Sequence, residues 1–323
     1  MTNLLAFENL SINFETPTGP VHAVRNVNFV VPENKVVGIV GESGCGKTTV
    51  ISAAMNLLSN NAVVASGRVS FQQEDILNLS EPELRRIRGE KISMVFQDPM
   101  TSQNPVISIG KQMMDIQYRQ SSLTKEMKRA NAVDMLNRVG IPDPEMRLNQ
   151  FPHELSGGMR QRISIAMAIL MKPSILIADE PTTALDVTME AQIIHLLREL
   201  QREFSSSILF ASHNLGLIAE LCDEVIVMYA GEIAEKGSCH DIFHRPSHPY
   251  TKALLACDPS RVMERTKKLP TIQGDVPDLQ IIPKGCVFAD RCPSVHDSCY
   301  DHRPGEVLVG ANHKASCHLL DNG

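Results

Sequence analysis

A glycine-rich run near the N-terminal end of the chain has the residue types and the spacing of a phosphate-binding loop. Its glycines let backbone N–H groups turn toward phosphate oxygens, and the positive end of the following helix strengthens the field there. Lys47 is expected to neutralise the terminal phosphates of ATP, and Thr48 to place its hydroxyl on Mg²⁺. A plain glycine turn before an ordinary helix is the alternative, but the expected strand-loop-helix context favours nucleotide binding. The predicted ATP-binding residues of this run are Gly41, Glu42, Ser43, Gly44, Cys45, Gly46, Lys47, Thr48 and Thr49.

Two adjacent carboxylates follow an apolar run that begins at Ser174. Asp179 is expected to contact Mg²⁺. Glu180, one residue later, can face the other way and polarise an attacking water. Such a base suits hydrolysis of ATP better than transfer of phosphate to a hydroxyl substrate. Alone, the pair is a weak signal, because acidic residues often end strands.

A third run carries a more specific resemblance. Leu155-Ser156-Gly157-Gly158-Met159, followed by a helical pattern, resembles the signature sequence of the ABC family of ATPases. Further segments match that family in its order: the phosphate loop, Gln97 within Val95 to Pro99, the Asp179 pair, Ala184-Leu185-Asp186, and His213 after a strand. The resemblance therefore covers a complete nucleotide-binding domain.

The resemblance implies roles for individual residues. Gln97 would contact Mg²⁺ or the attacking water and relay the nucleotide state to a membrane subunit, and His213 would touch the γ-phosphate. Phe14 stands where the family stacks an aromatic ring on adenine, with a buried core phenylalanine as the alternative. The expected catalytic residues are Glu180, His213 and Gln97, and the expected Mg²⁺ ligands are Thr48, Gln97 and Asp179.

In this family the signature residues bind the ATP held by the opposite subunit, so the resemblance implies two cassettes that close around shared nucleotide. The residues expected to act in trans are Ser156, Gly157, Gly158 and Asp186. The sequence departs from the commonest family pattern at Met159 and Asn214, and Gln103 is also less expected; the last two could soften subunit contacts. Neither Met159 nor Asn214 removes a catalytic group, so an active ATPase is expected.

Two later segments narrow the resemblance to one branch. The runs from Arg245 to Leu255 and from Ile272 to Leu279 are similar to segments of the oligopeptide, dipeptide and nickel importer family. The resemblance implies an ATPase subunit that drives uptake of di- or oligopeptides, with nickel, glycosides or another small solute as alternatives. A soluble ABC ATPase without a transport role is disfavoured, because such proteins usually carry two cassettes or a long coiled-coil insertion. The implied partners are a second, related ATPase, two transmembrane permease subunits and an extracytoplasmic solute-binding protein.

Four of the eight cysteines cluster near the C-terminus: Cys286, Cys292, Cys299 and Cys317. Four thiolates in a reducing compartment suit Zn²⁺ or an iron-sulfur cluster. Their gaps lack the close pair usual in zinc sites, which favours iron-sulfur, and some similar relatives carry a [4Fe-4S] cluster. Zn²⁺ and an unmetallated cap remain alternatives, and four histidines could substitute as ligands: His296, His302, His313 and His318.

The remaining cysteines are interpreted more simply. Cys222, Cys239 and Cys257 are expected to be small apolar residues. Cys45 is expected to contribute only its backbone N–H, although an exposed thiol beside phosphates would be open to alkylation.

The elements that position these residues are visible in the apolar pattern. Strands are expected at 4–14, 21–31, 35–40, 92–96, 175–178, 208–211 and 225–228, and a helical stretch at about 107–171. Buried strands interleaved with helices predict a mostly parallel sheet covered on both faces. The predicted fold is an α/β P-loop NTPase of the ABC nucleotide-binding type, with a mixed sheet core, an antiparallel β subdomain and a helical subdomain. Residues 1–256 are the predicted cassette, and residues 257–323 a small irregular appendage carrying the four clustered cysteines.

Composition limits where such a protein works. A net charge of −6 disfavours binding to nucleic acid. The longest apolar run, from Ile163 to Ala178, is interrupted by Lys172 and Pro173, so no membrane span is expected. The N-terminus lacks the pattern of a secretory signal. Together with these features, the resemblance to importer subunits implies a peripheral protein on the cytoplasmic face of the bacterial inner membrane, in contact with the membrane only through permease subunits.

Overall fold

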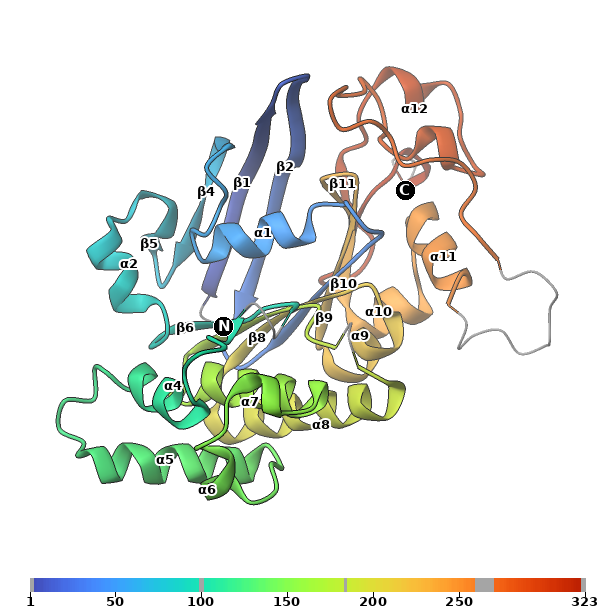
Figure 1. Ribbon diagram of the computed structural model, residues 1–323. Helices are drawn as coiled ribbons and strands as arrows, with labels where there is room; N and C mark the ends of the chain where they lie inside the picture. Colours follow the sequence, from blue (N-terminus) through green and yellow to red (C-terminus); the bar gives the residue numbers. More distant parts are fainter. Residues whose placement is uncertain (1–2, 99–101, 183–184, 259–269, 321–323) are drawn as a thin grey trace. The chain divides into compact units, whose positions relative to one another are not determined.

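The computed structural model describes residues 3–98, 102–182, 185–258 and 270–320 (Figure 1). The described residues form two units: those before position 80 and after position 209 make the first, and those between make the second. Pro99 and Ala184, which belong to two of the predicted motifs, lie outside the described residues.

An antiparallel sheet begins the first unit. Its strand order is β2-β1-β4-β5, and its strands are β1 (Asn3–Thr16), β2 (Gly19–Pro32), β4 (Ala62–Phe71) and β5 (Glu74–Asp75). Leu5, Leu10 and Ile12 on β1 are fully buried, and the rings of Phe7 and Phe29 stack with centroids 4.3 Å apart. The predicted antiparallel opening is confirmed, because the alternating apolar residues of β1 and β2 form one buried face.

A mixed sheet holds the rest of the first unit. The strand order is β11-β12-β10-β9-β3-β8, with β3 and β9 parallel and β9 and β10 antiparallel. β3 (Val36–Val40) is buried along its whole length, as is β8 (Ser207–Ser212). The remaining strands are β9 (Glu224–Tyr229), β10 (Glu232–Ser238), β11 (Glu306–Leu308) and β12 (Lys314–Ser316). This is the mixed core that the sequence predicts.

Short helices join these strands. Figure 1 shows α1 beside the long β1–β2 ribbon, and α1 follows β3 directly along the chain. The helices of the first unit are α1 (Lys47–Ala54), η1 (Ile76–Asn78), α9 (Leu215–Leu221), α10 (Cys239–His244), α11 (Pro249–Ala256), η4 (Ala289–Arg291), α12 (Ser298–Asp301) and η5 (His318–Leu320).

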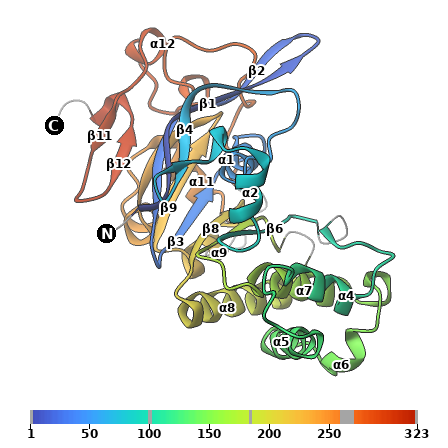
Figure 2. The same cartoon turned by 90° about the vertical axis from the view of Figure 1, so that its left-hand side faces the viewer.

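The C-terminal part is not a separate irregular appendage. Figure 2 shows the β11–β12 hairpin in red, and β12 pairs with β10, so the tail extends the mixed sheet. The fully buried carboxylate of Glu235 accepts hydrogen bonds from the Ser247 and His248 N–H groups and pairs with the His313 ring nitrogen at 2.6 Å. A buried carboxylate needs such partners, so this contact fixes the tail to β10.

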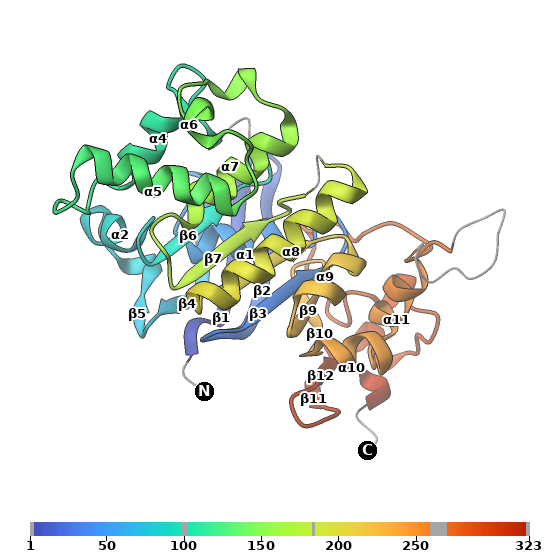
Figure 3. The ribbon, with the colours of Figure 1, turned by 90° about the horizontal axis from the view of Figure 1, so that it is seen from below.

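The second unit is largely helical. Figure 3 shows α4, α5, α6 and α7 gathered together, and β6 and β7 form a parallel pair. The predicted helical stretch is confirmed, and α8 buries an apolar stripe at Ile193, Leu197 and Leu200. The elements are α2 (Glu81–Ile87), β6 (Ile92–Val95), α4 (Ile109–Ile116), α5 (Lys125–Arg138), α6 (Pro144–Arg147), η2 (Pro152–Glu154), α7 (Gly157–Ile169), β7 (Ile175–Asp179) and α8 (Val187–Phe204).

Burial of His248 gives the stability of the fold a pH dependence. Desolvation lowers the pKa of its imidazole to about 4, opposed by Glu235 and assisted by Lys252. The unfolded chain, with a pKa of about 6.5, binds a proton between these values that the folded chain does not hold. The free energy of unfolding should therefore be highest above pH 6.5, and it should fall by about 3 kcal/mol as the pH decreases toward 4.

Urea unfolding at stepped pH measures this dependence. The matched variant is His248→Asn, which keeps an acceptor for the Tyr250 N–H that now bonds to the His248 ring. This variant should flatten the pH profile between 6.5 and 4. A profile as steep as that of the unaltered chain would contradict the assignment.

Candidate nucleotide-binding site

The phosphate loop connects β3 to α1 in a conformation that requires glycine. Gly44 and Gly46 have φ values of +79° and +104°, in the left-handed region that other residues rarely adopt. A Cβ on Gly46 would lie 2.6 Å from the Ala23 carbonyl oxygen, and one on Gly41 would lie 2.2 Å from the carbonyl oxygen of Met228. The loop is therefore packed against β2 and β9 by backbone contacts, which leaves no room for side chains on that side.

Lys47 holds the loop together from inside. Its ammonium group donates hydrogen bonds to the carbonyl oxygens of Gly41 at 2.8 Å and Glu42 at 3.2 Å, and the residue is 5% exposed. Ser43, Gly44 and Thr48 are exposed. The loop thus has the glycine cradle, the buried cation and the accessible hydroxyl that a polyphosphate with Mg²⁺ requires, and these residues fit both ATP and the metal.

The Cys45 thiol is not exposed, so the condition under which it would be open to alkylation is not met. The residue is 2% exposed, and burial raises the pKa of its thiol, with Lys47 acting in the opposite direction. The Cys45 sulfur packs against Gly41, and a Cβ added to Gly41 would lie 2.7 Å from that sulfur. A buried, protonated thiol is a poor nucleophile, so Cys45 is a packing residue.

A hairpin turn supports the loop from the mixed sheet. Gly231, in the turn between β9 and β10, donates its N–H to the Cys45 carbonyl oxygen at 3.0 Å. Arg25 on β2 holds that turn: its backbone N–H donates to the Gly231 carbonyl at 2.8 Å, and its guanidinium donates to the Ala230 carbonyl at 2.5 Å. The loop, the turn and β2 are therefore one hydrogen-bonded assembly.

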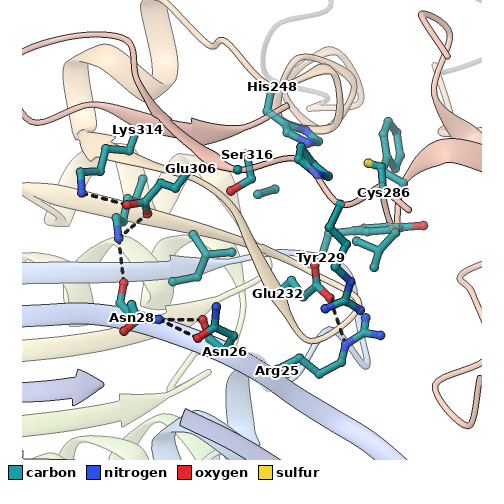
Figure 4. A pocket seen from close by; sticks show the side chains of 18 residues that line it. Arg25, Asn26, Asn28, Tyr229, Glu232, His248, Cys286, Glu306, Lys314 and Ser316 are labelled. Atoms are coloured by element: carbon teal, nitrogen blue, oxygen red, sulfur yellow. Dashed lines mark hydrogen bonds and ion pairs between the residues drawn. The ribbon is translucent and has the colours of Figure 1, made fainter. Parts of the chain in front are cut away.

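A cavity of about 520 Å³ lies beside this assembly (Figure 4). Figure 4 shows Arg25 next to Glu232, and the two form an ion pair at 3.2 Å. Burial raises the pKa of Glu232 and lowers that of Arg25. No residue of the phosphate loop lines this cavity, so it is distinct from the predicted nucleotide site.

Two further predicted site residues lie in the first unit. Phe14 is on β1 with Val21 and Ala62 as its strand neighbours, and it is partly exposed, so it is not a buried core residue. His213 is exposed directly after β8. Asn214 begins α9, where its side chain accepts a hydrogen bond from the Gly216 N–H at 3.0 Å. Asn214 therefore acts as a helix cap within its own chain.

The predicted catalytic carboxylates lie at the end of β7 in the second unit. Asp179 is buried, and Glu180 follows it with a φ of +45°, which turns its side chain away from the strand direction. The Gln97 amide donates a hydrogen bond to the Glu180 carboxylate at 3.4 Å. The structure therefore brings together Gln97 and Glu180, both of which are predicted to act on the attacking water.

The signature residues begin a long helix. Ser156 caps α7 by accepting a hydrogen bond from the Met159 N–H, and it is exposed. A Cβ on Gly158 would lie 2.5 Å from the methyl carbon of Met189 on α8. The N–H groups at the start of α7 therefore lie at an accessible helix end, which is suited to binding an anion.

Asp186 and Gln103 support these helices. Asp186 caps α8 by accepting a hydrogen bond from the Met189 N–H at 2.9 Å. Gln103 is 3% exposed and donates to the Arg160 carbonyl and the Ser164 hydroxyl of α7. Gln103 thus holds the signature helix within its own chain.

The four clustered cysteines line one small cavity of the first unit, together with His318. Burial raises the pKa of the Cys286 thiol to about 11, and the other three thiols add repulsion. Around one Zn²⁺ four thiolates have to stand about 3.8 Å apart. Within the described ranges, no group of three or more His, Cys, Asp or Glu side chains is arranged to hold a metal ion. The expected metal-binding appendage is therefore not supported.

Comparison with known proteins decides the family. Residues 24–183 match the ABC transporter family, and residues 234–299 match the oligopeptide/dipeptide transporter C-terminal region. The dipeptide transport ATP-binding protein of Bacillus subtilis is 47% identical over 99% of this chain and 96% of its own length. The chain belongs to the ABC transporter family. Two other relatives of this ABC protein are the oligopeptide transport ATP-binding protein of Salmonella typhimurium, 46% identical over 94% of this chain and 90% of that protein, and the dipeptide transport ATP-binding protein of Escherichia coli, 43% identical over 98% and 96%.

Solved structures agree with the ABC fold. A dimeric ATP-binding cassette in a post-hydrolysis state, bound to ADP and Pi, matches with a TM-score of 0.66 and 26% identity over 73% of this chain and 98% of that one. The cassette cbiO1 from Clostridium perfringens matches with a TM-score of 0.64 and 29% identity over 76% and 92%. The chain is thus an ABC-type ATPase. In the part of this ABC protein that the structure describes, no helix is both long and apolar enough to span a membrane.

Residues that the sequence patterns missed also contact the phosphate loop of this ABC protein. The Tyr250 hydroxyl accepts a hydrogen bond from the Glu42 N–H at 3.0 Å, and Arg291 forms an ion pair with the Glu42 carboxylate. Both lie more than 200 positions from the loop along the chain. Tyr250 lies in the run from Arg245 to Leu255 that resembles the importer branch, and this resemblance was the one sequence feature that pointed to it.

Replacing Gly46 with alanine tests the loop geometry. Gly46→Ala adds a Cβ 2.6 Å from the Ala23 carbonyl oxygen, which should displace the loop and weaken ATP binding at least about tenfold. The matched control is Gly19→Ala, because Gly19 has a similar φ of +122° and open space around it. Titration of each purified variant with a fluorescent ATP analogue measures the affinity. Equal affinities for the two variants would contradict the packing argument.

Proposed function

We propose that this chain is the ATP-hydrolysing subunit of an importer that takes up dipeptides or oligopeptides across the bacterial inner membrane. One observation carries the proposal: the chain is similar over nearly its whole length to dipeptide and oligopeptide transport ATP-binding proteins, including their C-terminal region. An ABC cassette common to many transporters accounts for residues 24–183 alone. The likeness of the C-terminal part therefore favours peptides over other solutes.

The first group of residues would bind the nucleotide. The loop from Gly41 to Thr49 would surround the phosphates with N–H groups, while Lys47 would exchange its loop carbonyl partners for phosphate oxygens. Phe14, partly exposed on β1, would stack on adenine. Thr48, Gln97 and Asp179 would hold Mg²⁺, which supplies neutralisation of the charge that develops on the phosphates.

A second group would carry out hydrolysis. Glu180 would accept a proton from the attacking water, and its hydrogen bond to Gln97 would fix the carboxylate in the required orientation. His213 would donate to the γ-phosphate.

A third group would act on a neighbouring cassette. The exposed start of α7, with Ser156, Gly157 and Gly158, would bind the phosphates of ATP held by a second subunit, and Asp186 would lie close to the same nucleotide. ATP would then hold two cassettes together and hydrolysis would release them, which converts phosphate chemistry into motion. A relative of the same fold is a dimer with ADP and Pi bound, which supports this part of the proposal.

The remaining partners follow from the proposed reaction. The cassettes would bind two transmembrane permease subunits at the cytoplasmic face of the inner membrane, and an extracytoplasmic solute-binding protein would deliver the peptide. The cassette would comprise residues 1–256, with a helical subdomain at about 107–171, and residues 257–323 would form the region characteristic of the peptide branch. The match of the peptide-transporter C-terminal region, at residues 234–299, begins before that boundary and includes the first part of the proposed C-terminal region.

We also propose that the four-cysteine cavity binds a [4Fe-4S] cluster rather than Zn²⁺. Cys286, Cys292, Cys299 and Cys317 line one cavity, and a cluster of four irons keeps its thiolates farther apart than a single ion does. Four cysteines around one cavity supply the number and type of ligands that such a cluster requires. The cluster would fasten the C-terminal segments, which have little apolar core of their own.

Replacing the proposed base tests the hydrolytic function. Glu180→Gln keeps the hydrogen-bonding shape of the side chain but removes the proton acceptor, so ATP binding should persist while turnover falls at least about 100-fold. The control is Glu199→Gln on α8, because Glu199 is 63% exposed and pairs only with His195 in the described structure. ATPase activity and uptake of a labelled dipeptide are measured in the reconstituted transporter. Normal turnover by Glu180→Gln would refute the assignment, and ATP turnover stimulated by nickel or a glycoside but not by peptides would refute the solute class.

Iron and sulfide analysis tests the cluster. Anaerobically purified protein should contain about four irons and four labile sulfides per chain and absorb in the visible range. Cys299→Ser should lower both contents, whereas Cys239→Ser, which alters a cysteine outside the cavity, should not. Stoichiometric zinc without iron, or no metal at all, would overturn the proposal.

A further inference from the structure

A bidentate ion pair joins the C-terminal part of the chain to the phosphate loop. The two terminal nitrogens of the Arg291 guanidinium donate to the two carboxylate oxygens of Glu42, at 2.7 and 3.0 Å. Glu42 is the second residue of the loop, and Arg291 is the last residue of η4. The two residues are 249 positions apart along the chain and lie in the same unit.

The ion pair is shielded and firmly held. The Arg291 side chain is 5% exposed, and it donates further hydrogen bonds to the carbonyl oxygens of Gln273 and Ile272 and to the Tyr229 hydroxyl. Its hydrogen bonds to Glu42 and Tyr229 raise the pKa of the guanidinium well above its usual range. By contrast, exposed pairs such as Arg85 with Glu81, at 73% and 55% exposure, contribute little to stability. The contact between Arg291 and Glu42 therefore fixes the position of the Glu42 side chain.

Glu42 is held by its backbone as well as by its side chain. Its N–H donates to the Tyr250 hydroxyl at 3.0 Å, and its carbonyl oxygen accepts from the Lys47 ammonium at 3.2 Å. The Tyr250 ring packs at 4.6 Å on Tyr229 and at 5.3 Å on Phe288. Two of the contacts that determine where Glu42 lies come from residues after position 249, Tyr250 and Arg291.

The position of Glu42 affects where the Lys47 ammonium group lies. The Glu42 carbonyl oxygen accepts a hydrogen bond from Lys47, and the Glu42 carboxylate is held by Arg291. A shift of Glu42 would therefore move a carbonyl partner of Lys47 and the first turn of the loop. An error of about 1 Å in such a cradle is enough to weaken binding substantially.

We infer that Arg291, assisted by Tyr250, is a positioning residue for the phosphate loop, so that the C-terminal part of the chain is a component of the ATP-binding machinery. The inference rests on the proposed function to the extent that ATP binds at this loop. Arg291 does not touch the nucleotide. Its effect is exerted through Glu42 on the affinity for ATP and not on the chemical step.

A merely structural role is the competing explanation, in which Arg291 only fastens the C-terminal part to the rest of the unit. Both roles predict a lower melting temperature when Arg291 is replaced. Only the positioning role predicts a selective loss of ATP affinity that depends on Glu42. Kinetics of the assembled transporter and ATP titration of the purified full-length chain distinguish the two.

The test uses Arg291→Gln, Glu42→Gln and the double variant. Each single variant should raise the Kd of the chain and the KM of the transporter for ATP about five- to tenfold, with kcat changed less than about twofold. The double variant should be no worse than either single one, because both remove the same interaction. Arg291→Lys should restore the affinity only in part, since an ammonium group cannot reproduce a bidentate contact.

The control removes an arginine and an ion pair elsewhere in the same unit. Arg245→Gln breaks an exposed pair with Asp241 and should leave the Kd and KM for ATP unchanged. Unchanged ATP affinity in Arg291→Gln, equal losses in Arg245→Gln, or additive effects in the double variant would each overturn the inference. If the unaltered chain bound no ATP, the proposed function would fail instead, so the two failures are distinguishable.

Discussion

A loop that presents its backbone N–H groups to an anion cannot support itself with side chains, and this constraint governs the first unit. Support has to come from neighbouring backbone, and the structure provides it: the Met228 and Ala23 carbonyls approach Gly41 and Gly46 too closely for any Cβ. The Gly231 N–H then ties the loop to the β9–β10 turn. The glycines are therefore required by the packing behind the loop as well as by the phosphates in front of it.

The same constraint explains the contacts of Lys47, which is buried within the loop. A buried ammonium group needs hydrogen-bond acceptors, and the Gly41 and Glu42 carbonyl oxygens supply them. Phosphate oxygens can replace those carbonyls with little rearrangement of the side chain. In the proposed function the cation would thus be ordered in advance, which would reduce the entropy cost of binding. The accuracy of that position depends on where Glu42 lies.

Local patterns predicted much of the fold. The alternation in β1 and the apolar runs of β3 and β7 are local, so these strands were predicted correctly, while the roles of the motifs at their ends stay predictions. β4 was missed, because its burial has no alternation over most of its length. The Cys45 carbonyl and the Gln103 side chain form hydrogen bonds with residues far away in the sequence, Gly231 and Ser164. No periodicity or spacing reports such contacts.

The clearest case of this kind is Arg291, which lies directly before Cys292 in a three-residue helix. The nearby cysteines have the residue type of metal ligands, whereas Arg291 belongs to no motif that indicates a function. A helix this short does not hold its own geometry, so the position of Arg291 depends on what fixes its neighbours. One of these is Cys286, whose N–H donates to the Cys299 carbonyl oxygen at 2.7 Å. Whatever holds the cysteine cavity together therefore also holds the arginine that fixes Glu42, and the stability of the C-terminal part becomes a determinant of ATP affinity.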